Sequence, residues 1–252
     1  MSNKKERLDK ILVDRGLVQS RERARALIMA GTVVVTDHVA DKAGMMVPLD
    51  SEIRLKGEVL PFVSRGGLKL QKALDEFAID VTGFAVLDVG ASTGGFTDCL
   101  LQRGARKIFA VDVGYGQLAW KLRQDERVVN LEKTNIRFLT PDKLPEIPDM
   151  AVIDASFISL DKVLPNTIRL IRDDGVVVAL IKPQFEVGRG EVGKGGVVRD
   201  EAKHQAVVAS IRALAESLGL TVEGVTESPI RGPKGNREFL IYLYKTASNK
   251  LI

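Results

Sequence analysis

The sequence predicts an α/β protein with a doubly wound, mainly parallel sheet, preceded by a small α+β domain. From residue 66 to residue 246, short apolar runs alternate with amphipathic helical segments, which is the rhythm of repeated βαβ units. The first sixty residues instead combine two short helical patterns with several β-like runs. The 252 residues suffice for one large domain and a small companion. We therefore expect a small domain at 1–60, a linker at 61–65 and a larger domain at 66–246.

Composition argues against several classes of protein. Apolar residues make up 45% of the chain and charged residues 28%, as in ordinary globular domains. The longest dense apolar run, Val176–Ile181, is far shorter than the roughly 20 residues that a membrane-spanning helix needs. Residues 1–10 do not resemble a secretion signal, so we expect a cytoplasmic protein with no membrane partner. The single cysteine, Cys99, excludes an internal disulfide and a cysteine-rich zinc site, and we expect no metal.

Two helices and three strands are expected in the small domain. Apolar residues recur at helical spacing from Leu8 to Leu12, and Gly16 marks the end of that helix. Ser20 is a good N-cap for a second helix, which ends at Gly31. The β-like runs lie at 32–36, 52–55 and 59–63.

Positive charge is concentrated at the start of the chain. Residues 1–30 hold eight Lys and Arg against four acids, which equals the +4 excess of the whole chain. Arg21 and Arg25 are four residues apart and project from one side of the second helix. A local basic patch points to a polyanionic partner, because phosphate contacts supply most non-specific affinity for nucleic acids. On charge alone, a solvated helix face is an equally good interpretation.

The string RLDKILVDRGLVQSRERARALIMAGTVVV, at 7–35, resembles the small RNA-binding fold first described in small-subunit ribosomal protein four. In that family the second helix presents arginines to structured RNA. The resemblance implies RNA contacts from Arg7, Lys10, Arg21 and Arg25, to which we add Arg65 at the start of the larger domain.

The larger domain begins with a helix after Gly66 and Gly67, with an apolar face from Leu70 to Phe77. The other expected helices lie at 95–102, at 118–123, around 161–171 and around 201–218. The expected strands lie at 85–89, 107–111, 128–131, 150–153, 176–181, 221–226 and 238–244.

A glycine-rich turn joins a strand to a helix in VLDVGASTGGFTDCLL, at 86–101. Its glycines allow a ligand to approach the backbone closely, and ligands of such sheets bind at the carboxyl ends of the strands. The turn lacks the spacing of a dinucleotide fingerprint, and no Walker lysine follows it. A cofactor without a pyrophosphate, such as S-adenosylmethionine, fits this pattern.

Two polar residues further along the chain support an adenosine cofactor. Asp112 ends the next strand, where a carboxylate can accept both hydroxyls of a ribose; its alternative role is that of a turn residue. Asn135 could contact the adenine edge or simply cap a turn. The expected cofactor residues are Asp88, Gly90, Ala91, Ser92, Gly94, Gly95, Phe96, Asp112 and Asn135.

A charged residue follows each of two apolar strands of the larger domain. Asp154 comes directly after 150–153, and Lys182 comes directly after 176–181. If both strands are central and parallel, both side chains face the cofactor cleft. Charges there are costly unless they are paired or functional. A structural Asp–Lys ion pair and a catalytic pair both remain open at this point.

The whole chain resembles the TlyA (haemolysin-A) family of ribosomal-RNA 2′-O-methyltransferases, and its larger domain is similar to the FtsJ heat-shock rRNA methyltransferases. The matching strings are SRGGLKL at 64–70, LDVGASTGGF at 87–96, VDVGYGQL at 111–118, IDASFISL at 153–160, IKPQFE at 181–186 and NREFLIYL at 236–243. The family's Lys-Asp-Lys-Glu tetrad falls on Lys69, Asp154, Lys182 and Glu238. The resemblance implies S-adenosylmethionine as methyl donor and a cytidine ribose of ribosomal RNA, in ribosomal subunits, as acceptor.

Ribose methylation gives these four residues distinct chemical tasks. A 2′-hydroxyl is a weak acid and must lose its proton as it attacks the methyl group. Lys182, after losing its own proton, is the candidate base, and the positive charge of Lys69 favours that loss. Asp154 and Glu238 would orient the lysines and the hydroxyl, although their charge alone would raise the lysine pKa. The glycine-rich segment 188–196 is either a loop that closes over RNA or a plain connector, and a basic loop at 229–238 leads into Glu238.

Three other functions compete with this interpretation. Base N-methyltransferases carry an Asp/Asn-Pro-Pro-aromatic motif, whereas residues 154–157 read Asp-Ala-Ser-Phe. A membrane-lytic haemolysin would need an export signal or a spanning segment. A protein that only binds RNA would have no use for the cofactor. Cys99 follows the glycine-rich turn among apolar neighbours, and we expect it to be buried rather than nucleophilic.

Overall fold

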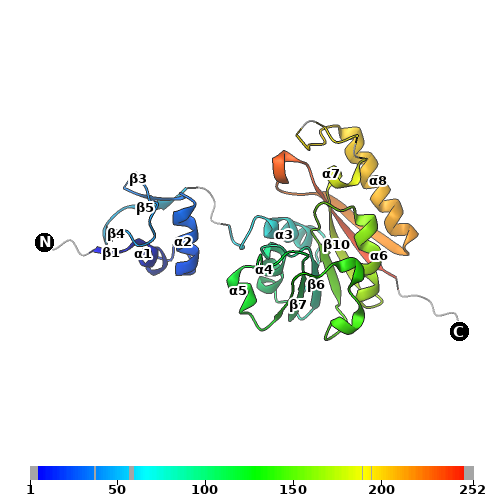
Figure 1. Cartoon of the computed structure of the whole chain (residues 1–252), viewed down its shortest axis with the longest axis horizontal. Coiled ribbons are helices and arrows are strands. Elements are labelled where there is room, and N and C mark those ends of the chain that lie inside the picture. The colour runs from blue at the N-terminus through cyan, green and yellow to red at the C-terminus, as the bar shows by residue number, and fades with distance from the viewer. Residues whose placement is uncertain (1–4, 37, 57–59, 189, 194, 247–252) are drawn as a thin grey trace. The chain divides into compact units, whose positions relative to one another are not determined.

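The computed structural model describes residues 5–36, 38–56, 60–188, 190–193 and 195–246. The chain divides into two compact units, Met1–Leu60 and Pro61–Ile252 (Figure 1). None of the helices in the described parts of the chain is long and apolar enough to cross a membrane.

The first unit contains both expected helices and two of the expected strands. Helix α1 spans Leu8–Asp14, α2 spans Arg21–Met29, and each is followed by a glycine with φ of +67°. The Ser20 hydroxyl accepts a hydrogen bond of 3.2 Å from the Arg23 amide, which confirms the predicted N-cap. Strands β2 (Val33–Val35), β3 (His38–Val39) and β5 (Ile53–Leu55) form one antiparallel sheet, and β1 (Lys5–Arg7) pairs with β4 (Met46–Pro48).

The strand predicted at 59–63 is wrong where the structure describes it. Residues 60–63 form no strand, and Val59 lies outside the described residues. Pro61 has no amide hydrogen to donate to a ladder. Phe62 is buried in the core of the second unit, and the Val63 amide donates to Asp98 at 2.8 Å. Phe62 and Val63 therefore serve the packing of the larger unit.

The second unit has a single seven-stranded sheet among its described residues. Its strands are β6 (Ala85–Val89), β7 (Lys107–Val111), β8 (Val128–Leu131), β9 (Met150–Ile153), β10 (Val176–Ile181), β11 (Leu220–Glu227) and β12 (Phe239–Lys245). The spatial order is β11-β12-β10-β9-β6-β7-β8; the five strands from β10 to β8 are parallel, and β12 is antiparallel to both its neighbours. This confirms the predicted fold class.

Helices cover both faces of this sheet (Figure 1). They are α3 (Gly66–Glu76), α4 (Gly95–Gln102), α5 (Trp120–Arg123), α6 (Leu160–Leu170), α7 (Pro183–Glu186) and α8 (Glu201–Ser217). Residues of α3, α4 and α5 share one apolar cluster with one face of the sheet, and residues of α6 and α8 share another with the opposite face. Along β10 the side chains alternate between the two clusters, as a strand covered on both faces requires.

Two details of the larger unit differ from the prediction. Helix α5 begins at Trp120 rather than at residue 118, because Leu118 is buried and Ala119 is extended, with its amide bonded to Thr93. Helix α7 follows Lys182 directly and was not expected from the sequence. The strands and the other helices match the expected ranges to within one or two residues.

The topology brings the predicted site residues to one edge of the sheet. The loops after β6, β7, β9 and β10 all leave from the carboxyl ends of parallel strands. Glu238 lies just before β12, and β12 runs antiparallel to β10 with Phe239 opposite Ile181. Glu238 therefore starts its strand beside the point where β10 ends and Lys182 follows.

Candidate active site

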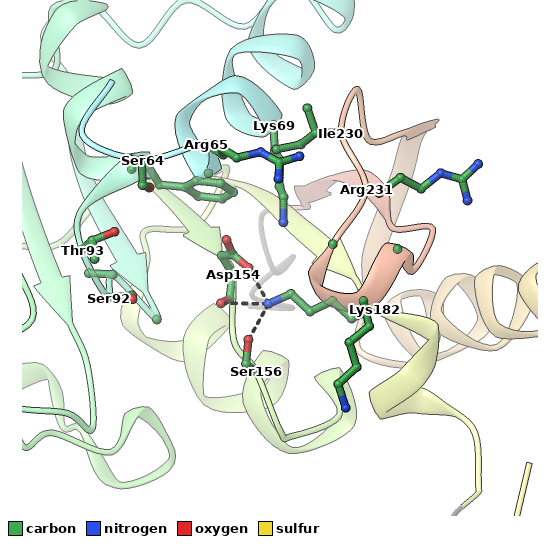
Figure 2. Close-up of a pocket in the computed structure, with 18 residues that line it drawn as sticks. Ser64, Arg65, Lys69, Ser92, Thr93, Asp154, Ser156, Lys182, Ile230 and Arg231 are labelled. Carbon is green, nitrogen blue, oxygen red and sulfur yellow. Dashed lines mark hydrogen bonds and ion pairs between the residues drawn. The ribbon is translucent and has the colours of Figure 1, made fainter. Parts of the chain in front are cut away.

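The four residues of the predicted tetrad form two ion pairs in the second unit. Lys69 Nζ lies 2.6 Å from Glu238 Oε2. Lys182 Nζ lies 2.5 Å from Asp154 Oδ1 (Figure 2). Lys69 comes from α3, and the other three come from the ends of β9, β10 and β12. Lys69, Lys182 and Glu238 are buried. Buried charges are costly unless paired, so each lysine has the carboxylate that its burial requires.

These pairs border a cavity of about 640 Å³ (Figure 2). Lys69, Asp154 and Lys182 line it, and Glu238 lies behind Lys69. Arg65, Arg231 and Lys234 line it as well. Asp154 is the only acid among the described residues that line it, and five lysines and arginines make this lining positive. Such a surface favours a polyanionic ligand.

Two polar residues of this site have no counterpart in the sequence prediction. The Ser156 hydroxyl accepts a hydrogen bond of 2.7 Å from Lys182 Nζ. The Gln184 amide donates to Glu238 Oε1 at 3.4 Å, and the buried Gln184 Oε1 has no partner. Both residues lie within motifs that match the family, and only the folded geometry distinguishes them from their neighbours.

A second cavity, of about 470 Å³, lies on the side of Asp112 and Asn135. Asp112 Oδ2 accepts from the Ser92 amide at 2.8 Å, and its Oδ1 accepts from the Gly114 amide at 2.7 Å. Asn135 Oδ1 accepts from the Arg137 amide at 3.1 Å, at the start of a short 3₁₀ turn. Both residues thus perform the turn role considered above, and both also line the cavity.

Some residues of the glycine-rich turn line the cavities, and others hold the turn against its neighbours. Gly90, Ala91, Ser92, Gly95 and Phe96 line one or both cavities. Gly90 has φ of +85°, and a Cβ there would lie 2.9 Å from the Asp154 carbonyl oxygen. This glycine therefore lets the loop after β6 lie against the loop after β9.

Two predicted cofactor residues, Gly94 and Asp88, lie outside the linings of both cavities. A Cβ on Gly94 would lie 2.2 Å from the Leu122 side chain, so this position serves packing against α5. Asp88 is fully buried and accepts a 2.6 Å hydrogen bond from the Thr97 hydroxyl. Burial raises the pKa of Asp88 to about 7, and its second carboxyl oxygen has no partner.

The two cavities share Gly90, Ser92, Asp154 and Ser156. The cavity beside Asp112 and Asn135 has a mostly apolar lining, and the other cavity is positive and carries the lysines. A ligand in the Asp112 cavity and a ligand in the lysine cavity would meet at these four residues. Proximity of this kind is what a group transfer between two bound substrates requires.

In the first unit, three of the predicted RNA-contact arginines surround one carboxylate. Asp9 is fully buried, and Arg7, Arg21 and Arg25 lie 3.0, 2.9 and 3.2 Å from its oxygens. Their hydrogen bonds hold the pKa of Asp9 well below its usual range. The guanidinium groups stay about half exposed, so the cluster keeps net positive charge at the surface.

Lys10 and Cys99 take simpler positions. Lys10 pairs with Glu6 at 2.6 Å on the surface.

Cys99 is buried, and burial raises the pKa of its thiol to about 12, which fits the expected packing role. Among the described residues, no group of three or more His, Cys, Asp or Glu is arranged to hold a metal ion.

Two family models match this chain, and curated relatives cover most of its length. Residues 62–245 match the model for FtsJ-like methyltransferases, and residues 6–53 match the S4 domain. The chain is 50% identical over 245 residues to YqxC of Bacillus subtilis strain 168, a candidate rRNA methyltransferase, covering 97% of this chain and 87% of that protein. It is 47% identical over 245 residues to the 16S/23S rRNA (cytidine-2′-O)-methyltransferase TlyA of Mycobacterium tuberculosis, covering 94% of this chain and 89% of that protein.

Solved structures extend the same comparison. A candidate hemolysin from Streptococcus thermophilus has a TM-score of 0.75 and 47% sequence identity, with coverage of 97% of this chain and 90% of that one. The FtsJ-like match spans all the residues that form the two ion pairs and the glycine-rich turn. The chain therefore belongs to the TlyA family, with an S4 domain followed by an FtsJ-like methyltransferase domain.

Proposed function

We propose that this protein transfers a methyl group from S-adenosylmethionine to the 2′-hydroxyl of a cytidine ribose in ribosomal RNA. The observation that carries the proposal is the position of two lysine–carboxylate pairs beside the residues that both cavities share. A weakly acidic hydroxyl needs a base at the place where donor and acceptor meet. Lys182 is that base, once it has lost its own proton.

The other three tetrad residues position the base and the acceptor. Asp154 holds the Lys182 amine at 2.5 Å. Lys69, held by Glu238, places a second positive charge at the same cavity, which favours an anionic 2′-oxygen. Base-amine methylation has no evident use for two lysines, so the residues favour a ribose acceptor.

The residues of the second cavity fit an adenosine cofactor. Each Asp112 oxygen accepts one backbone hydrogen bond and keeps lone-pair capacity for a ribose hydroxyl. Gly90 also lines this cavity and has no side chain to keep a ligand away from its backbone. When bound, S-adenosylmethionine supplies an electrophilic methyl group on a sulfonium. Asn135 is the polar group that we assign to the adenine edge.

Two separate basic surfaces support an RNA substrate. Arg7, Arg21 and Arg25 of the first unit form the Asp9-centred cluster, which we assign to phosphates of structured RNA. Arg65 lines the lysine cavity of the second unit and is assigned to a phosphate near the target nucleotide. Lys10 is the weakest of these candidates because Glu6 already neutralises it.

The acceptor class follows from the relatives. The Mycobacterium tuberculosis relative is named for methylation of 16S and 23S rRNA, and we propose ribosomal subunits as the substrate of this chain. Such a substrate implies action in the cytoplasm. Mass-spectrometric mapping of rRNA from cells with and without the protein should find one or more ribose-methylated cytidines that depend on it. A protein-dependent methyl group on a base would contradict the proposal.

Asp112→Asn should weaken S-adenosylmethionine binding by about 10-fold or more, because the amide keeps one acceptor oxygen and offers a donor where the second ribose hydroxyl needs an acceptor. Isothermal titration calorimetry measures the change. Asp142→Asn is the matched control, because this exposed acid lies outside both cavity linings and should bind the cofactor like the original protein. Equal affinity of the two variants would remove Asp112 from the cofactor site.

Replacing Arg21 and Arg25 together with Gln should weaken binding to ribosomal subunits. The logarithm of the binding constant should also fall less steeply with the logarithm of the salt concentration. The slope should decrease by about one for each phosphate that is no longer neutralised. Glutamine is preferable to a charge reversal, since a Glu beside the buried Asp9 would also destabilise the unit. Filter binding over a range of salt concentrations measures the slope. Arg212→Gln, on the exposed side of α8, is the control. An unchanged slope would exclude the two arginines as phosphate contacts.

A further inference from the structure

We propose that Ser156 is a catalytic residue of this methyl transfer, whose hydroxyl relays the acceptor's proton to Lys182. The inference rests on the proposed function and adds to it the route by which the proton reaches the base. Three observations carry it: the place of Ser156 between the two cavities, the fixed backbone that holds it there, and the hydrogen bonds of Lys182.

Ser156 lies where a bound donor and a bound acceptor would meet. It is one of four residues that line both cavities, and it is exposed to them, unlike the buried amine of Lys182. Its Oγ lies 2.7 Å from Lys182 Nζ (Figure 2). A substrate hydroxyl that enters either cavity can therefore contact Ser156 while Ser156 contacts the lysine.

The backbone around Ser156 is held in place on both sides. The Asp154 amide donates to Val89 at 2.9 Å, and Gly90 lies against the Asp154 carbonyl, where a Cβ would come within 2.9 Å. Phe157 has φ of +63°, in the left-handed region, and the chain bends there, directly after Ser156. A non-glycine residue is strained in that conformation, so the surrounding structure must hold it there.

The hydrogen bonds of Lys182 direct its lone pair toward Ser156. The amine lies close to three oxygens: Asp154 Oδ1 at 2.5 Å, the Asp154 carbonyl at 3.3 Å and Ser156 Oγ at 2.7 Å. An ammonium can donate to all three. A neutral amine has two N–H groups and one lone pair, and the carboxylate and the carbonyl can only accept. The hydroxyl is the one partner able to donate, so it faces the lone pair of the base.

In this relay the 2′-oxygen forms its bond to the methyl carbon, while the methyl's bond to sulfur breaks and its electron pair stays on sulfur. The proton of the 2′-hydroxyl moves to Ser156 Oγ, and the original Ser156 proton moves to Lys182 Nζ. Ser156 ends as a neutral hydroxyl, Lys182 ends as an ammonium, and solvent removes that proton before the next turnover.

Single-turnover methylation of unmodified ribosomal subunits tests the relay. Ser156→Ala and Ser156→Gly remove the hydroxyl from an exposed position, and each should lower the rate by about 10²–10³-fold, within the range of general acid–base contributions. Ser156→Thr keeps the hydroxyl and should stay within about 10-fold of the original rate. Ser159→Ala is the matched control, because this nearby serine bonds Glu186 and lines neither cavity. Calorimetry should find the same cofactor affinity in all four variants.

The isotope dependence of the rate separates a relay from a merely structural serine. In mixtures of H₂O and D₂O, two protons moving together give a curved dependence of the single-turnover rate on deuterium fraction. Any residual activity of Ser156→Ala should instead depend linearly on the deuterium fraction. A wild-type rate in Ser156→Ala and Ser156→Gly would overturn the relay, and so would a loss explained by weaker cofactor binding. An active Lys182→Met enzyme would instead overturn the base assigned under the proposed function.

Discussion

Replacing Lys182 with methionine should abolish detectable methyl transfer, a loss of at least about 10²–10⁴-fold, while RNA and cofactor still bind. Methionine fills a similar volume in this buried position but has no lone pair that accepts a proton. Lys182→Arg should fail as well, because a guanidinium does not deprotonate in the working range of pH. Quenched single-turnover assays with radiolabelled methyl donor measure the rate, and calorimetry measures cofactor affinity.

The control for this pair of variants is an exposed lysine elsewhere in the same unit. Lys162→Met, on α6, removes a surface amine that pairs with Asp161 and should leave the rate unchanged. An active Lys182→Arg enzyme would mean that the residue contributes only a fixed positive charge, and the base would then have to be sought elsewhere.

The larger unit was predictable because its signals are local. Each central strand is a short apolar run, and the polar residue that ends it reports where the loop begins. Once the strands are parallel, their carboxyl ends must lie at one edge, so the sequence alone suffices to group Asp112, Asp154 and Lys182. Glu238 needed more than local information, since only the antiparallel pairing of β12 with β10 brings it to this edge.

The smaller unit was less predictable because its strands are only two or three residues long and one of them, Lys5–Arg7, is polar. Lys5–Arg7 has no apolar alternation, and its pairing with Met46–Pro48 comes from contacts distant in sequence. Asp9 was not singled out, although it orders the arginines, because its partners lie 2, 12 and 16 residues away and share no single spacing. The apolar run at 59–63 was misassigned because burial against another element and burial in a sheet give the same local pattern.

The sequence identified candidate residues of the site, but it did not identify the contacts that each of them makes. The family resemblance indicated a tetrad, but the division into Lys69–Glu238 and Lys182–Asp154 pairs depends on side-chain positions. Ser156 was visible only as part of the Asp-Ala-Ser-Phe segment. Its hydrogen bond to Lys182 joins the ends of two different strands, and no spacing along the chain encodes that contact.

The Lys69–Glu238 pair allows the structural and catalytic roles of a buried ion pair to be separated. Glu238→Ala should destabilise the protein by about 3–5 kcal/mol, because it leaves the Lys69 ammonium buried without its carboxylate. It should also abolish methyl transfer. Replacing both residues, with Lys69→Met and Glu238→Leu, removes the uncompensated charge and should restore most of the lost free energy of unfolding. Urea unfolding measures the stability of each variant.

Activity of the double variant decides between the two roles. If the pair only stabilises the fold, the apolar replacement should methylate RNA at nearly the original rate. We expect it to fold and to bind cofactor but to remain inactive, because the cavity then lacks the positive charge that Lys69 places beside Lys182. Lys72→Met with Glu76→Gln is the matched control, a partly exposed pair on the same helix as Lys69 at 3.5 Å. The glutamine keeps an acceptor for the Thr226 hydroxyl, so loss of this ion pair should change neither stability nor rate appreciably. Recovery of both stability and activity in the buried double variant would reduce Lys69 and Glu238 to a structural ion pair and leave Lys182 and Asp154 as the whole of the catalytic machinery.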